Sequence, residues 1–350
     1  MKVSIGTNIK DGPWGGGNLF AVNLKSYLLN NGHEVVHDLE DDDLDIILIT
    51  EPRKTSESSA FTHIQVQNYL RFQNSNALVV HRINECDERK GTNYVNKYLI
   101  EANKVADQTV FVSRWLKDLY IRQGMNQLRK TVILAGADKK IFNTDNKSVW
   151  KEDQKIKLIT HHWGANKNKG FDVYEKIDDL MGTEKWKEKI EFTYVGNLPA
   201  NFNFRNARHI TPLSGEKLAK EIKKNHIYIT ASINEPSGNH HIEGSQCGLP
   251  VMFIESGGVT EYCKDYGTSY TLQTLESKLE FVLENYNSLS SKISLYPNNS
   301  DRMAEEFMDL FKNMLKQKDT ILNSRSISQS TSLENITYQI KKSLLKFLKY

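Results

Sequence analysis

Short apolar runs alternate with longer amphipathic stretches along most of the chain. The first half contains five apolar runs of the length of buried strands, at 3–5, 46–49, 78–80, 110–112 and 132–134. Segments with helical periodicity lie between them, such as 18–31, which precedes Gly32, a residue suited to the position after a helix. Strands that alternate with helices predict a doubly wound parallel sheet.

The same alternation restarts after a polar, strand-free segment at 143–155, which we interpret as an interdomain linker. Four further apolar runs follow, at 158–160, 192–195, 227–231 and 251–254. The predicted fold class is therefore α/β, with two doubly wound parallel-sheet, Rossmann-like domains that face each other across a cleft. Ligands bind such sheets at the carboxyl edges of the strands. The predicted boundaries are 1–145 and 146–315 for the domains and 316–350 for a tail.

The tail differs from the rest of the chain. Residues 324–334 are polar and rich in serine, and 335–350 has apolar positions at helical spacing among lysines. This pattern predicts a basic amphipathic helix. Two interpretations stay open, a surface helix that packs on the body and a peripheral contact with an anionic membrane.

Composition places the chain among ordinary globular proteins. Of its 350 residues, 39% are hydrophobic and 25% are charged, and the formal net charge of +3 is too weak to indicate nucleic-acid binding. The sequence shows no 20-residue apolar run and no secretory signal pattern, so we expect a cytoplasmic location, with peripheral contact at the inner membrane face as an alternative. The three cysteines have neither disulfide-framework nor zinc spacing.

The segment 233–262 carries the clearest chemical pattern. It is predicted to form a strand end, a loop with Glu235, a helix, a buried strand and a second glycine loop at 257–258. Three residues lead into that helix: Ser237, Gly238 and Asn239. A helix start offers unpaired N–H groups and a positive dipole end to anions. Glu243 follows Glu235 by eight residues and is expected on the same rim of the cleft.

The spacing of Glu235 and Glu243 resembles the E-x7-E motif of family-four retaining glycosyltransferases, which have the GT-B architecture. Four other segments agree with that family in order: GGGN at 15–18, ADQTVFVSRWLKDLY at 106–120, GADKKIF at 136–142 and HHWGANKNKGFD at 161–172. The resemblance covers residues 1–315. It implies an acceptor-side first domain, a nucleotide-sugar donor domain after it, and transfer with retention of configuration.

The resemblance also implies roles for individual residues. Glu243 would bind the donor ribose, Glu235 the transferred sugar, and Lys169 the leaving diphosphate. The family often has an arginine shortly before that lysine, whereas this chain has none between 161 and 170, so Lys167 would take its place. The implied catalytic residues are Glu235, His81 and Lys169. The implied donor-binding residues are Gly16, Gly17, Lys167, Lys169, Ser237, Gly238, Asn239, His240 and Glu243.

The segment 81–91 combines three acidic and three basic residues just after a predicted strand. Its place at the cleft edge predicts contacts with the acceptor, although a solvated loop is equally compatible with its composition. The candidate acceptor residues are Arg82, Glu85, Asp87 and Arg89.

Several patterns suggest metals or dinucleotides but are better explained otherwise. The acidic run at 37–49 contains Asp-x-Asp spacings, yet it precedes a buried strand far from the predicted donor site, which favours a solvated loop. The pairs 161–162 and 240–241 are adjacent histidines without a third ligand at a recognisable spacing. The first glycine loop lacks the G-x-G-x-x-G fingerprint. We expect no metal and no cofactor, with a UDP- or GDP-sugar as the substrate.

These observations predict a metal-independent retaining glycosyltransferase that moves a sugar from a nucleotide-diphosphate sugar to a glycan, a lipid or another hydroxyl acceptor. Two alternatives share the fold class: a nucleotide-sugar epimerase or phosphorylase, and a non-catalytic protein that binds nucleotide sugars or glycans. An epimerase would convert a nucleotide sugar without an acceptor, and a binding protein would bind it without turnover.

Overall fold

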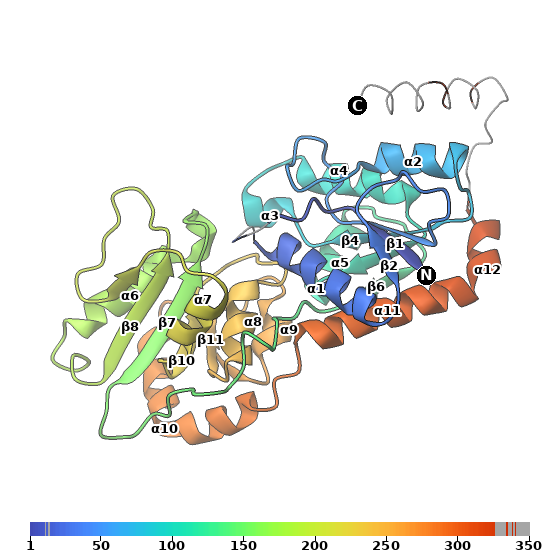
Figure 1. Cartoon of the computed structure of the whole chain (residues 1–350). Coiled ribbons are helices and arrows are strands. Elements are labelled where there is room, and N and C mark those ends of the chain that lie inside the picture. Colours follow the sequence, from blue (N-terminus) through green and yellow to red (C-terminus); the bar gives the residue numbers. More distant parts are fainter. Residues whose placement is uncertain (11, 13–14, 326–333, 335–337, 339, 341–350) are drawn as a thin grey trace.

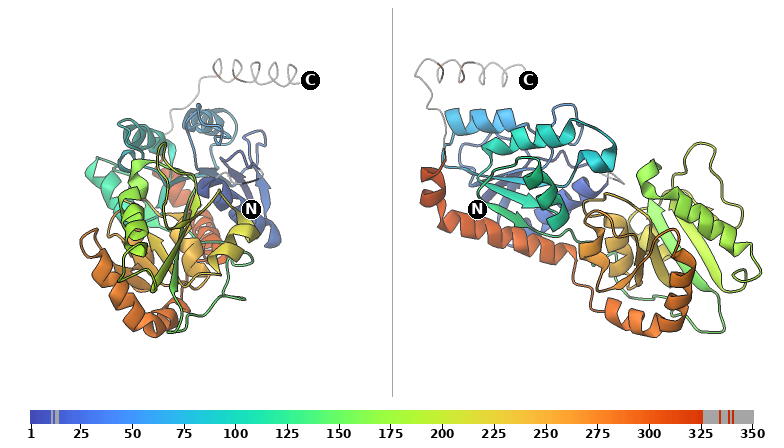
Figure 2. Two further views of the ribbon diagram at one scale, coloured as in Figure 1. Left: turned by 90° about the vertical axis from the view of Figure 1, so that its left-hand side faces the viewer. Right: turned by 180° about the vertical axis from the view of Figure 1, so that it is seen from behind.

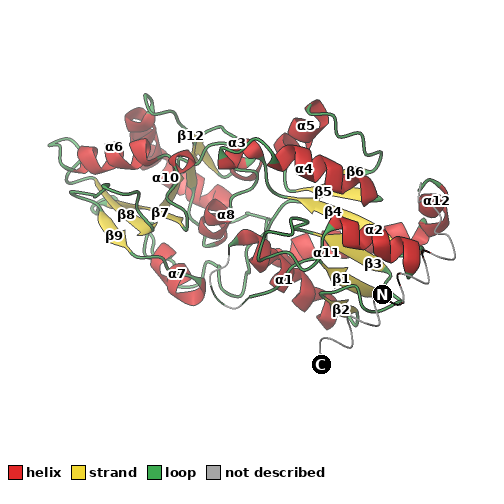
Figure 3. Cartoon of the chain, turned by 90° about the horizontal axis from the view of Figure 1, so that it is seen from above, coloured by secondary structure: helices red, strands yellow, loops and turns green. Residues whose placement is uncertain are grey.

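The computed structural model describes residues 1–10, 12, 15–325, 334, 338 and 340, and these form two domains that lie side by side (Figure 1). The first sheet has the strand order β2-β1-β3-β4-β5-β6, with every neighbouring pair parallel. Its strands are β1 (Lys2–Ile5), β2 (Glu34–Val36), β3 (Ile46–Ile49), β4 (Leu78–Ile83), β5 (Gln108–Phe111) and β6 (Lys130–Val132). Helices cover both of its faces, as Figure 3 shows from above.

The second sheet is also parallel throughout, with the order β12-β11-β10-β7-β8-β9. Its strands are β7 (Ile156–His162), β8 (Ile190–Gly196), β9 (Arg208–Ile210), β10 (Ile227–Thr230), β11 (Val251–Phe253) and β12 (Gly267–Ser269). The predicted fold class is thereby confirmed. Strands β2, β9 and β12 carry no apolar run because each is partly exposed, and the pattern therefore does not predict them.

The helices of the first domain begin and end where the local sequence allows. They are α1 (Gly16–Asn30), α2 (His63–Phe72), α3 (Asp87–Lys90), α4 (Val95–Ala102), η1 (Asn103–Val105) and α5 (Arg114–Arg122). Thr62 and Gln65 form a capping box at the start of α2, and the Ser113 hydroxyl caps α5. Gly32 follows α1 with a φ of 75°, as its position after the predicted helix requires.

The second domain has an aromatic core on one face of its sheet. Tyr174, Trp186, Phe192 and Tyr194 are almost fully buried there, and burial of such side chains stabilises a domain by roughly 1.5–3 kcal/mol each. The helices are η2 (Lys167–Lys169), α6 (Phe171–Met181), α7 (Gly215–Ile222), α8 (Asn239–Gln246), α9 (Val259–Cys263) and α10 (Leu275–Ile293).

The chain crosses between the domains twice, at neighbouring positions. Ala137 pairs with Asn299, and a side chain at Gly136 would overlap the Asn299 backbone. Segment 143–155 has no helix or strand, as predicted, but Lys147 and Ser148 already bond to the second domain, so the first crossing precedes it.

After the second crossing, α11 (Ser300–Lys316) and α12 (Lys318–Asn323) return to the first domain (Figure 2). Phe307 packs against Phe20 of α1 with ring centroids 5.1 Å apart, and Phe311 lies in the same core. The predicted boundary at 315 assigns most of α11 to the second domain. In the structure, however, the apolar face of α11 completes the core of the first domain.

The predicted basic helix at 335–350 falls outside the described residues except for two positions, and its membrane contact stays a prediction. Among the described residues, no helix is both long and apolar enough to cross a membrane. Within the acidic run at 37–49, Asp41 and Asp43 lie at the amino edge of the first sheet, where they form ion pairs with Lys2. That edge is opposite the carboxyl edge, where parallel sheets bind ligands.

Candidate active site between the domains

Two helix N-termini from different domains meet at the cleft. A Cβ atom on Gly16, the first residue of α1, would lie 2.9 Å from the side-chain oxygen of Asn239, the first residue of α8. Both helices are preceded by a glycine at positive φ, Gly15 and Gly238, and no side chain of the described residues caps either start. Their first N–H groups and positive dipole ends therefore converge on one region, which suits an anionic ligand.

Lys169 and Glu235 form a direct ion pair beside this region. The Nζ atom of Lys169 lies 2.7 Å from Oε2 of Glu235, and both residues are more than nine-tenths buried. Lys169 ends η2, and the following Gly170 has a φ of 74° and packs against Ala231 so closely that a side chain would not fit. The predicted lysine and the first predicted glutamate are therefore held together.

The second glycine loop positions the Glu235 backbone. The Gly258 N–H donates to the Glu235 carbonyl over 2.8 Å, and a Cβ atom on Gly257, at a φ of 64°, would overlap that same carbonyl. Asn234 has a φ of 54° and donates its N–H to the Ser256 hydroxyl. The predicted glycine loop at 257–258 thus packs against the backbone of the loop that carries Glu235.

A third charged group reaches Glu235 from the first domain. Arg89 donates from Nε to Glu235 Oε1 over 2.7 Å, and its Nη1 donates to Glu85 over 3.2 Å. Lys90 lies 2.8 Å from the other oxygen of Glu85. Charges therefore alternate from Lys90 through Glu85, Arg89 and Glu235 to Lys169, and this chain of three cations and two carboxylates joins the domains.

The charges fix the protonation of Glu235. Burial alone would raise its pKa, but the neighbouring charges of Lys169 and Arg89 outweigh burial and lower the pKa to about 2. The carboxylate is therefore ionised at neutral pH and can accept hydrogen bonds from ligand hydroxyls, but it has no proton to donate.

Glu243, the second predicted glutamate, contacts a histidine rather than Glu235 or Lys169. Its Oε2 lies 2.8 Å from His161 Nε2, and His161 Nδ1 lies 3.0 Å from the Tyr228 hydroxyl. The Tyr228 hydroxyl also accepts a hydrogen bond from the backbone N–H of His161. A carboxylate oxygen accepts, so His161 donates from Nε2 to Glu243. His161 orients Glu243, and no motif in the sequence assigns it that role.

Three further histidines are buried, His162 at the end of β7 and His240 and His241 in the first turn of α8. His162 Nε2 lies 2.7 Å from the Tyr174 hydroxyl, and His240 Nε2 lies 2.8 Å from the Thr230 hydroxyl. His241 bonds to the Ser237 carbonyl. Burial lowers the pKa of all three, to about 4 for His241. His240 thus packs inward, and the described residues contain no group of three or more His, Cys, Asp or Glu side chains arranged to hold a metal.

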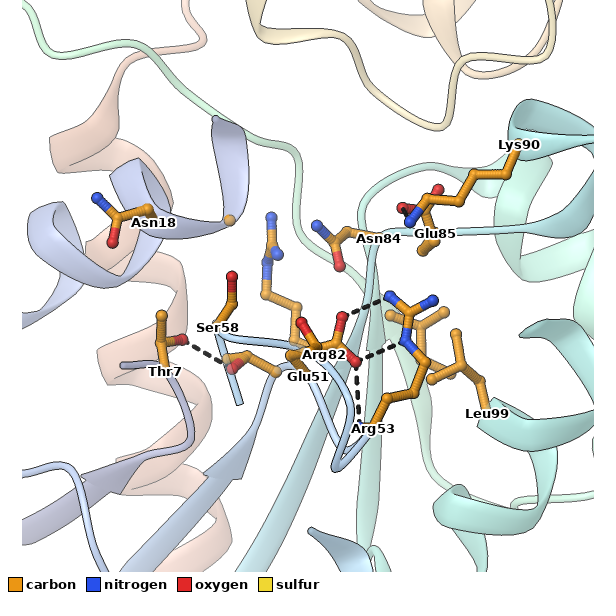
Figure 4. Close-up of a pocket in the computed structure, with 14 residues that line it drawn as sticks. Thr7, Asn18, Glu51, Arg53, Ser58, Arg82, Asn84, Glu85, Lys90 and Leu99 are labelled. Carbon is orange, nitrogen blue, oxygen red and sulfur yellow. Dashed lines mark hydrogen bonds and ion pairs between the residues drawn. The ribbon is translucent and has the colours of Figure 1, made fainter. Parts of the chain in front are cut away.

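The first domain contributes a cavity of about 290 Å³ at the carboxyl edge of its sheet (Figure 4). Gly17 of α1, Arg82 at the end of β4, Glu85 and Lys90 all line it, and Arg53 holds Glu51 there through a 2.7 Å bond. Because Glu85 also contacts Arg89, the cavity adjoins the chain of charges that leads to Glu235.

Two predicted first-domain residues lie elsewhere. His81 is fully buried, and its Nδ1 lies 2.9 Å from the Asn103 side chain on the opposite face of β4 from Arg82. Side chains alternate along a strand, so His81 and Arg82 cannot both enter the cavity. Asp87 accepts bonds from Thr92 and from the N–H groups at the start of α4, which makes it a positioning residue for the loop.

The remaining predicted residues differ in exposure. Lys167 is exposed and Lys169 is buried, so the two lysines of the loop differ in environment. Ser237 is half-buried. The exposed Trp163 lies close to this loop, and its carbonyl accepts a bond from Asn197.

No family model and no curated protein matches the chain. Solved structures do match its fold. A glycosyltransferase from Rickettsia africae superposes with a TM-score of 0.64 at 14% identity, over 90% of this chain and 98% of that one. The catalytic domain of starch synthase IV from Arabidopsis thaliana, bound to ADP and acarbose, superposes with a TM-score of 0.68 at 12% identity, over 90% of this chain and 99% of that one.

HepE from Anabaena, in complex with UDP and glucose, gives a TM-score of 0.61 at 13% identity, over 93% of this chain and all of that one. At such identities the likeness shows the fold alone, which is the two-domain GT-B architecture. Similarity over nearly the full length of each neighbour indicates that both domains, and their pairing across a cleft, are shared.

Proposed function

We propose that the chain is a retaining glycosyltransferase that uses a nucleotide-diphosphate sugar, a UDP- or GDP-sugar, without a metal. The observation that carries the proposal is the ionised Glu235, held by Lys169 beside the facing N-termini of α1 and α8. The named neighbours support it, since HepE was solved with UDP and glucose and starch synthase IV with ADP and acarbose.

The proposed reaction separates charge, and the site has groups of both signs. When the sugar leaves the diphosphate, negative charge grows on the phosphate oxygens and positive charge on the sugar ring. Lys169 and the two helix N-termini stabilise the first. Glu235, which cannot act as an acid, positions the sugar through its hydroxyls and lies close enough to favour the positive ring.

Retention follows from attack on the face from which the diphosphate leaves. The acceptor oxygen bonds to the anomeric carbon, the sugar–phosphate bond breaks, and the acceptor proton passes to the departing phosphate oxygen. This scheme needs no buried acid–base pair of the glycosidase kind. Glu243 contacts His161 through Oε2 and binds the donor ribose hydroxyls through Oε1, which accepts no hydrogen bond from any other described residue.

The test is transfer from a panel of UDP-, GDP- and ADP-sugars to glycan and lipid acceptors, with the anomeric configuration of the product read by NMR. Glu235→Gln should lower kcat by about 100-fold or more while the protein stays folded. Glu188→Gln, a surface glutamate that pairs with Lys155, serves as the matched control. Conversion of the nucleotide sugar without an acceptor would indicate an epimerase, and binding without turnover would indicate a binding protein.

A further inference from the structure

Arg82 is a buried cation for which the described part of the chain provides no counter-charge. Its side chain is 4% exposed, and its guanidinium carbon lies 3.9 Å from the centre of the Phe20 ring. Among the described residues, no carboxylate forms an ion pair with it and no group accepts a hydrogen bond from it. Burial lowers its pKa to about 10, so the group remains charged at neutral pH.

The other cations of the same cavity are neutralised. Arg53 makes a two-pronged contact with Glu51, and Lys90 pairs with Glu85. A guanidinium has five N–H donors, and a buried charge that lacks a partner is costly. The face of Phe20 offsets only part of this cost. The cavity therefore has one cation that its own walls leave unsatisfied.

Arg82 extends into the middle of the cavity, between Ser58 on one side and Asn84 on the other (Figure 4). Gly17, in the first turn of the 15-residue α1, also lines it, and a side chain there would meet open space. The cavity thus joins a guanidinium and a helix N-terminus, which suit an anion, to hydroxyl and amide groups, which suit sugar hydroxyls.

All residues that line this cavity belong to the first domain, between Thr7 and Leu99, whereas Lys169, Glu235 and Glu243 belong to the second. We propose that the cavity is the acceptor site and that the acceptor carries an anionic group, a phosphate or a carboxylate, which pairs with Arg82. The assignment of this ligand as an acceptor rests on the proposed glycosyltransferase function. The volume of about 290 Å³ suits a ligand of about one sugar ring with its anionic substituent.

The test measures binding in the absence of a donor, so that it does not depend on transfer. Glucose 6-phosphate, glucuronic acid and glucose are titrated by calorimetry into the full chain and into Arg82→Met and Arg82→Lys. One anionic sugar should bind at least 10-fold more tightly than glucose, which also distinguishes phosphate from carboxylate. Arg82→Met should abolish that difference, and Arg82→Lys should keep part of it.

Stability separates a ligand-binding arginine from a structural one. Arg82→Met keeps the packing on Phe20 and removes an unpaired charge, so its Tm should equal or exceed that of the unaltered chain. Arg53→Met, which leaves Glu51 without its partner in the same cavity, should lower the Tm. Equal affinity for charged and neutral sugars, or no binding of either anionic sugar at millimolar concentration, would overturn the proposal.

If transfer is found, the kinetics provide a second, independent reading. Arg82→Met should raise the KM for the acceptor and leave the KM for the nucleotide sugar unchanged. A raised KM for the nucleotide sugar alone would place the anion of the donor at Arg82 and would also overturn the proposal. Absence of transfer with intact Arg82-dependent binding would instead count against the proposed function alone.

Discussion

Arg89 and Glu235 lie 2.7 Å apart although they belong to different domains and are 146 residues apart in the sequence. The contact is almost enclosed, since the Glu235 side chain is 7% exposed, and the Asn168 side chain also donates to the Arg89 carbonyl. One guanidinium thus ties α3 of the first domain to the carboxylate that we place at the transferred sugar. Domain pairing and active-site geometry are coupled through this arginine.

We expect a measurable coupling between these two residues. In a double-mutant cycle of Arg89→Met and Glu235→Gln, the coupling in the free energy of unfolding should be about 1–3 kcal/mol, because each single change leaves a buried charge with fewer partners. Denaturant unfolding of the four proteins measures it. Arg122→Met, an exposed arginine, should show no coupling with Glu235→Gln, and a zero value for Arg89 would show that the contact is not formed in solution.

Lys169 and Lys167 lie in one loop but should differ in importance. Lys169→Met removes the buried cation beside the proposed diphosphate and should lower kcat by about 100- to 1,000-fold. Lys167→Met changes an exposed lysine two residues away and should lower kcat by less than about 5-fold. Steady-state kinetics with the best donor decide this. Equal losses for the two variants would contradict this difference and would support Lys167 as the replacement for the arginine that the family often has.

Stability should fall in mild acid because of the buried histidines. The pKa values of His162, His240 and His241 are lowered in the folded protein by burial, to about 4 for His241, from an ordinary value near 6.5. Below pH 6.5 the unfolded chain therefore binds protons that the folded chain does not, and stability is lost down to about pH 4. The slope is about 1.4 kcal/mol per pH unit for each such histidine.

Urea midpoints measured at intervals from pH 7.5 to pH 4.5 test this sign. His241→Asn should reduce the slope by about one histidine's share. A constant or rising midpoint over this range would contradict the buried, neutral state of the three rings. Glu235 acts in a separate window, since its lowered pKa contributes stability that is lost only below its ordinary value of 4.5, towards pH 2.

The glycine loop under Glu235 offers a test of backbone positioning. Gly257→Ala forces a left-handed residue against the Glu235 carbonyl, whereas Gly32→Ala imposes a similar φ where a side chain would meet open space. Both changes should lower the free energy of unfolding by about 1 kcal/mol, because alanine is disfavoured in the left-handed backbone conformation. Only Gly257→Ala should also lower kcat by about 10-fold or more. Equal kinetics for the two variants would show that the loop does not position Glu235.

Much of the fold can be predicted from the sequence because its central strands are buried on both faces. The four residues of β3 are fully buried, and such runs stand out as apolar. The return of α11 to the first domain cannot be predicted this way, since its amphipathic pattern shows that one face is buried but not against which sheet. Exposed edge strands such as β9 lack the apolar signal altogether.

In the candidate site, too, some contacts can be predicted from the sequence and others cannot. The family resemblance assigns Glu235 and Lys169 to one donor site, and in the structure the two side chains form a direct ion pair. The partnership of Arg89 with Glu235 depends on how two domains dock, which no local pattern records. Strand alternation places His81 and Arg82 on opposite faces of β4, so only Arg82 lines the cavity, and a role of His81 in the reaction stays a prediction.

The most direct measurement is a crystal structure of the chain soaked with UDP or GDP. The diphosphate should lie between the first residues of α1 and α8, with a phosphate oxygen within hydrogen-bond distance of Lys169 Nζ and the ribose against Glu243. A diphosphate bound at any other place, or a nucleotide that leaves Lys169 and Glu243 without contact, would contradict the nucleotide-sugar site.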